Sequence, residues 1–155
     1  MKISFEEIVK AYSDMVYRVA FNILADTEDS KDCMQNVFLR YYKHQDSIKE
    51  EEHAKAWLIR VTVNESKRIL KLNSRKSEVS LDEIANKVFK EDAESKDLFK
   101  EVMKLDKKYR TVVFLYYYEG YSLKEIADIL RRNPATVRTQ LSRARELLKN
   151  QLKED

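Results

Sequence analysis

Glycine, proline and cysteine are nearly absent from this chain, whose 155 residues include one of each. Hairpin turns favour glycine, so its scarcity argues against a sheet of many strands. The single Cys33 cannot form an internal disulfide, and with only His44 and His53 for company it has no zinc-binding spacing. The composition therefore predicts an all-α protein of the reducing cytoplasm, without a metal or cofactor.

Long apolar runs are missing as well. The longest, residues 112–118, is far too short to cross a bilayer, and the first ten residues carry acids where a signal peptide needs an apolar stretch. No spacing typical of a catalytic nucleophile, a metal site or a phosphate-binding loop is present. We expect no membrane insertion, no export and no enzymatic activity.

Positive charge is distributed unevenly along the chain. Behind the formal net charge of +3 there is a basic segment at residues 53–75, with six Lys and Arg side chains against Glu65 alone. A second basic segment at residues 131–149 has six basic residues and one acid, and the middle of the chain is acidic. Two separate positive patches suggest two contacts with one long polyanion.

Residues 121–148 read as two short helices joined by a tight turn. Ser122 precedes Glu125 by three residues, the spacing of a capping box, and Asn133-Pro134 is typical of a second helix start. In the second helix an apolar stripe is opposed by a polar face. The stripe consists of Val137, Leu141, Ala144 and Leu148, and the polar face of Arg138, Thr139, Ser142 and Arg143.

This pattern matches the helix-turn-helix, whose second helix enters the major groove of DNA. The polar face would then touch DNA, and the six basic residues would attract its phosphates. The alternative is an ordinary helical hairpin with a solvated basic face.

Three helices are predicted in the first half of the chain. A capping-box pattern at Ser4–Glu7 begins the first, and apolar residues then recur at helical spacing. A second helix follows the polar break at 25–30, and a third starts near Ala54 after the polar loop 44–53. We expect these helices to form a first domain, residues 1–74.

A second domain is predicted after a change in composition. Residues 75–95 are largely polar and indicate a linker, with one short helix around the apolar residues of 81–89. Helices over 97–103 and 107–118 then lead into the helix-turn-helix and complete a domain at 96–155. The expected fold is thus two small helical domains joined by a polar linker.

Several aromatic residues need an assignment. Trp57 shares a stripe with Val61, so we assign it to the core rather than to base stacking. The run Tyr116, Tyr117 and Tyr118 is assigned to core and boundary packing rather than to a stacking platform.

Three motifs resemble the extracytoplasmic-function sigma factors, small two-domain members of the bacterial sigma-70 family of RNA polymerase specificity subunits. Residues 29–40, DSKDCMQNVFLR, are similar to the family's segment that binds the largest polymerase subunit. Residues 56–64, AWLIRVTVN, resemble the segment at the melting promoter element, and residues 105–138 resemble the C-terminal domain. The motifs occur in the family's order and at compatible distances.

The resemblance implies a bacterial protein that binds core RNA polymerase and promoter DNA, supports transcription initiation, and is controlled by an anti-sigma factor. The implied polymerase contacts are Asp32, Gln35, Phe38 and Arg40, and the implied contacts with the melting minus-ten region are Asn64, Lys67, Arg68 and Lys71. The second helix of the helix-turn-helix would enter the minus-thirty-five major groove. The family captures a flipped base near residues 45–55, where the acidic sequence of this chain indicates no particular residue.

The chain departs from the family pattern in places. Arg131 and Arg132 stand where the turn often has glycine and an aliphatic residue, and Asn36 replaces a frequent acid. Two other classes stay open. A stand-alone helix-turn-helix regulator would use only the second domain, and a helical adaptor for proteins would make both basic patches incidental.

Overall fold

The computed structural model describes residues 3–72 and 93–154, and within these ranges every regular element is helical. The chain divides into two compact units, residues 1–75 and 76–155. The expected all-α fold with two helical domains is confirmed. The short helix expected within 81–89 and most of the expected linker lie outside the described residues.

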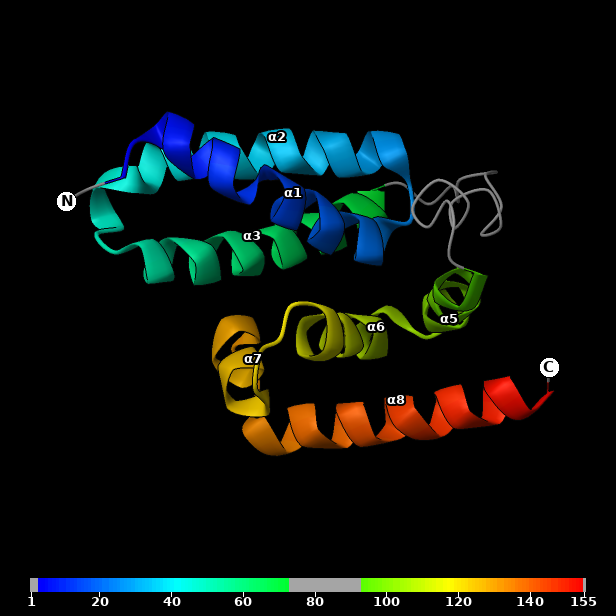
Figure 1. The fold of residues 1–155 in the computed structure, drawn as a ribbon. Helices are drawn as coiled ribbons and strands as arrows, with labels where there is room; N and C mark the ends of the chain where they lie inside the picture. Colours follow the sequence, from blue (N-terminus) through cyan, green and yellow to red (C-terminus); the bar gives the residue numbers. More distant parts are fainter. Residues whose placement is uncertain (1–2, 73–92, 155) are drawn as a thin grey trace. The chain divides into compact units, whose positions relative to one another are not determined.

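Unit 1 is a bundle of three long helices, α1 (Phe5–Leu24), α2 (Thr27–His44) and α3 (Glu51–Leu72), with a 3-10 turn, η1 (Gln45–Ser47), after α2. Each of the three packs against the other two (Figure 1). Its core is made of aliphatic side chains with at most 2% exposure. They include Ile8, Val16, Val19 and Ile23 from α1, Val37 from α2, and Leu58, Ile59 and Val63 from α3.

The start of α1 follows the predicted capping box. The Glu7 N–H donates to Ser4 Oγ (3.2 Å), and Glu7 Oε1 accepts from the Ser4 N–H (3.4 Å). These contacts satisfy two of the free amides at the helix start. α1 ends at Leu24, and the capping residue Ala25 has the left-handed backbone conformation with φ 52°.

The predicted breaks in unit 1 were too long. Asp26 Oδ1 accepts from the Asp29 N–H (2.8 Å), so α2 already begins at Thr27. α3 begins at Glu51, three residues before the predicted start, with two acids in its first turn. Acidic side chains are stabilising at a helix N-terminus, so residues that read as polar loop belong to first turns.

Unit 2 contains α5 (Ala93–Met103), α6 (Lys107–Val113), a π-helical turn η2 (Phe114–Tyr118), α7 (Leu123–Leu130) and α8 (Pro134–Glu154). Within the unit, α8 contacts α5, α6 and α7 (Figure 1). The helix predicted over 107–118 is regular only to Val113. Beyond it the Glu119 N–H donates to the carbonyl of Phe114, five residues back, at 3.1 Å. No helix in the described parts of the chain is both long and apolar enough to span a membrane.

Candidate nucleic-acid and protein interfaces

The helix-turn-helix starts at the predicted cap. The Glu125 N–H donates to Ser122 Oγ (3.1 Å), and Glu125 Oε1 accepts from the Ser122 N–H (3.0 Å). α7 then buries Ile126, Ala127 and Ile129.

The turn adopts the geometry that glycine favours, although its residue is arginine. Arg131 ends α7 in the left-handed conformation, with φ 53° and ψ 48°. The Arg132 N–H donates to the Ala127 carbonyl at 3.0 Å. The Arg132 guanidinium donates to Gln140 Oε1 of α8 (3.0 Å), and its burial lowers the pKa of Arg132. Arg132 thus connects the turn to α8. In the family that the sequence resembles, this turn position often has an aliphatic residue.

α8 starts at the predicted position and shows the predicted faces. Asn133 Oδ1 accepts from the Ala135 N–H (2.9 Å), and Pro134 is the first helical residue. The stripe residues Val137, Leu141 and Ala144 are buried, with at most 2% exposure, and Leu148 is half-buried. The four candidate DNA contacts Arg138, Thr139, Ser142 and Arg143 are all exposed.

A cavity of about 330 Å³ lies beside the exposed face of α8. Thr139 and Arg143 line it from α8, and Lys108 and Tyr109 line it from α6. The Lys108 ammonium lies 5.1 Å from the centre of the Tyr109 ring. Sequence reasoning did not assign Lys108 or Tyr109 to this surface, because their approach to α8 depends on packing between distant segments.

α3 presents the candidate contacts for the melting region. Asn64, Arg68 and Lys71 are exposed, and Lys67 is half-buried. These four residues lie within three turns of the helix, so a single DNA strand lying along it could contact several of them. Arg68 is already engaged within the protein, since its Nε donates to Glu65 Oε1 at 2.9 Å.

α2 presents three of the four candidate polymerase contacts. Asp32, Gln35 and Arg40 are exposed. Phe38 is buried, with 7% exposure, so its ring offers almost no surface to a partner. The four residues therefore do not form one open patch.

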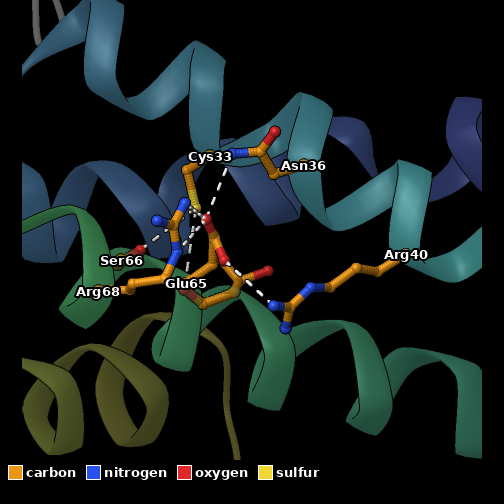
Figure 2. Close-up of polar contacts among 7 residues, drawn as sticks. Cys33, Asn36, Arg40, Glu65, Ser66 and Arg68 are labelled. Carbon is orange, nitrogen blue, oxygen red and sulfur yellow. Dashed lines mark hydrogen bonds and ion pairs between the residues drawn. The ribbon is translucent and has the colours of Figure 1, made fainter.

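Glu65 is a buried carboxylate between α2 and α3 (Figure 2). It pairs with Arg68 of its own helix and with Arg40 of α2, whose Nη2 lies 3.8 Å from Oε2. Asn36 Nδ2 also donates to Glu65 Oε1 (3.2 Å). The hydrogen bond from Arg68 is the main cause that lowers the pKa of Glu65, although burial opposes it. From the sequence, Glu65 was identified only as the single acid of the basic segment 53–75.

Cys33 lies next to this cluster and is fully buried. Its Sγ is 3.4 Å from Ser66 Oγ and 3.8 Å from the carbonyl oxygen of Thr62. Burial raises the pKa of the Cys33 thiol to about 11. The thiol is therefore neutral at physiological pH and serves as a packing group.

The aromatic assignments have different outcomes. Trp57 is half-buried and lies edge-on to Tyr41 in unit 1, with ring centres 5.7 Å apart. Tyr117 and Tyr118 are 52% and 46% exposed, so they lie at the boundary and not in the core. Together with side chains of α5 and α8 they line a largely apolar cavity of about 490 Å³ in unit 2. Arg145 of α8 donates to the Tyr117 hydroxyl at 2.7 Å.

Fold and surfaces together define a two-domain helical protein with a C-terminal helix-turn-helix. Residues 8–76 match the family described as Sigma-70 region 2, and residues 96–148 match Sigma-70, region 4.

The chain is similar over most of its length to known sigma factors. It is 31% identical to the ECF RNA polymerase sigma factor SigW of Bacillus subtilis, over 97% of this chain and 90% of that protein. It is 32% identical to the RNA polymerase sigma-E factor of Streptomyces coelicolor, over 97% of this chain and 86% of that protein.

Two solved structures share the fold. One is the sigma factor RpoE in complex with the anti-sigma factor NepR from Bartonella quintana, with a TM-score of 0.78 and 20% identity over 97% of this chain and 98% of that one. The other is CnrH in complex with the cytosolic domain of CnrY, with a TM-score of 0.72 and 22% identity over 97% of this chain and 88% of that one.

The chain belongs to the extracytoplasmic-function (ECF) sigma factors of the sigma-70 family. It acts as an RNA polymerase sigma factor, which binds core polymerase, recognises promoter DNA and supports transcription initiation. A stand-alone helix-turn-helix regulator is less well supported, because it would need only the second of the two matched regions.

Proposed function

We propose that the two units divide the work of promoter recognition. Unit 1 binds core polymerase through α2 and the minus-ten region through α3, and unit 2 places α8 in the major groove of the minus-thirty-five element. The observation that carries the proposal is the two-faced α8, with a buried stripe behind four exposed polar side chains.

In unit 2 we assign the base and phosphate contacts to the polar face of α8. Arginine can donate two hydrogen bonds to the O6 and N7 atoms of guanine, and threonine and serine can bind either bases or phosphates. Arg138 and Arg143 are therefore the candidates for base readout. Thr139 and Ser142 lie between them on the same face. Lys108 of α6 lines the adjoining cavity and is a further candidate phosphate contact.

In unit 1 we assign DNA to the exposed face of α3. The Asn64 amide can bond a base edge, while Lys67, Arg68 and Lys71 hold phosphates of a separated strand. On α2 the exposed Asp32, Gln35 and Arg40 would contact polymerase. The buried Phe38 would hold α2 in place for that contact instead of meeting the partner itself.

We also propose control by an anti-sigma factor. The support is the fold shared with RpoE and CnrH, since RpoE was solved with the anti-sigma factor NepR and CnrH with the cytosolic domain of CnrY. Because its partner is RNA polymerase, we place this chain in the bacterial cytoplasm. We assign it no catalytic residue, because polymerase supplies the chemistry of transcription.

Run-off transcription with core polymerase on a pool of genomic promoters tests the proposal. We expect specific starts with the wild-type chain and far fewer with an Asp32→Ala/Gln35→Ala double substitution. The matched control is Lys10→Ala/Asp14→Ala, which removes two exposed side chains from α1. DNA binding without any specific start would instead support the stand-alone regulator.

The assignment of α8 has its own test. With holoenzyme on a promoter found in that assay, Arg138→Ala or Arg143→Ala should each weaken binding by about 1–3 kcal/mol if the side chain reads a base. The loss should be confined to DNA with the native minus-thirty-five sequence. Lys153→Ala, an exposed residue at the far end of α8, is the control. Equal losses on native and scrambled elements would reassign the residue to phosphate binding.

A further inference from the structure

One buried carboxylate connects the two surfaces proposed for unit 1. Glu65 is 2% exposed, and its two arginine partners come from different helices. Arg68 lies on α3 among the candidate DNA contacts, and Arg40 lies on α2 among the candidate polymerase contacts. Figure 2 shows both guanidinium groups approaching the same carboxylate.

The carboxylate of Glu65 is buried, whereas the side chains of Arg40 and Arg68 are half-exposed, so only the two arginines can reach an outside partner. The Arg40 and Arg68 side chains are 52% and 51% exposed, although Glu65 is almost inaccessible. A buried carboxylate needs a cation or donors to stay ionised, whereas a half-exposed arginine can bind an outside partner instead. Asn36 donates one neutral hydrogen bond to Glu65, which cannot replace a positive charge.

We propose that Glu65 is a positioning residue that couples the polymerase-facing side of α2 to the DNA-facing side of α3, because Arg40 and Arg68 share its carboxylate. The inference rests on the function proposed for these two faces. When DNA draws Arg68 away from Glu65, the carboxylate holds Arg40 more tightly and so disfavours its contact with polymerase. When polymerase draws Arg40 away, the carboxylate holds Arg68 more tightly in the same manner. The coupling is therefore competitive, and it must be reciprocal, as any linkage between two binding equilibria is.

The test measures the affinity of the full chain for core polymerase in the absence of DNA. Arg68→Ala removes one of the two cations, so Glu65 holds Arg40 back and the affinity should fall about threefold, a modest coupling between neighbouring charges. In a Glu65→Gln background the same Arg68→Ala change should have no effect. A structural Arg68–Glu65 pair would show the same dependence on residue 65, so the discriminating readout is the Arg40→Ala background, in which Arg68→Ala should also have no effect if Arg40 transmits the coupling. Lys10→Ala, which removes one positive charge from α1, is the control for net charge.

Two results would overturn the coupling. If Arg40→Ala weakens polymerase binding but Arg68→Ala acts equally in both backgrounds, the coupling is wrong and the proposed function of α2 stands. If Arg40→Ala leaves polymerase binding unchanged, the role of Arg40 fails and the coupling fails with it. Should Glu65→Gln not fold, as circular dichroism would show, the Arg40→Ala/Arg68→Ala double variant decides, since additive single effects would also overturn the coupling.

Discussion

Replacing Arg131 by glycine should stabilise unit 2. Arg131 has φ 53° and ψ 48°, and its side chain is exposed. An L-residue in this conformation costs about 1–2 kcal/mol, whereas glycine adopts it freely. Against this, glycine lowers the stability of the fold by about 0.5–1 kcal/mol, because the unfolded chain has more conformational freedom at a glycine. At the centres of these two ranges the net gain for Arg131→Gly is about 0.75 kcal/mol.

Thermal unfolding of the full chain, followed by circular dichroism, measures this gain. For a unit of this size about 1 kcal/mol corresponds to about 4–8 °C, so the melting temperature of unit 2 should rise by about 3–6 °C. Asparagine tolerates the left-handed conformation better than arginine, so Arg131→Asn should give a smaller rise, and the β-branched Arg131→Val a fall.

Arg138→Gly is the matched control. It makes the same chemical change at an exposed position inside α8, where glycine should cost about 1 kcal/mol. Opposite signs at the two positions would assign the effect to backbone conformation. A lower melting temperature for Arg131→Gly would refute the reasoning, because it would mean that the arginine side chain stabilises the turn by contacts stronger than the conformational cost.

Three further changes test the packing and the titration of the fold. Leu141→Ala should cost about 3 kcal/mol in urea unfolding, since Leu141 is 2% exposed in the core of unit 2, and a loss below about 1 kcal/mol would mean that the site collapses. Ser122→Ala should cost about 1 kcal/mol by removing the cap of α7, with Ser142→Ala as an exposed control on α8. The Cys33 thiol has its pKa raised from 9.0 to about 11 by burial, so its contribution to stability is complete below pH 9 and is lost as the pH rises to 11. Cys33→Ala should therefore flatten the alkaline fall in the unfolding free energy of unit 1, and an unchanged pH profile would argue against a buried thiol.

Local patterns in the sequence were enough to predict most of the helices. Caps depend on residues three apart, so Ser4 and Ser122 could be recognised without any knowledge of the fold. The apolar stripe of α8 was predicted for the same reason, because the helical period alone decides which side chains share a face. Boundaries were less accurate where acids begin a helix, since the acids in the first turns of α2 and α3 also suit a loop.

The site was predictable only in part. The exposed face of α8 follows from the helical period, and the candidate residues on α2 and α3 came from the family resemblance. The burial of Phe38 and the approach of Lys108 to α8 did not follow from either. Both depend on which helices pack together.

By itself, then, the sequence determined the helical class, the faces of the helices and the membership in a family, because each of these depends on residues that are near in the chain or on recognisable motifs. Only the tertiary structure decided that Glu65 lies between two arginines from separate helices. Arg40 and Glu65 are brought together by the packing of α2 on α3. A contact of this kind has no periodic signal, since the hydrophobic core, and not the charged residues themselves, sets the distance between the two helices.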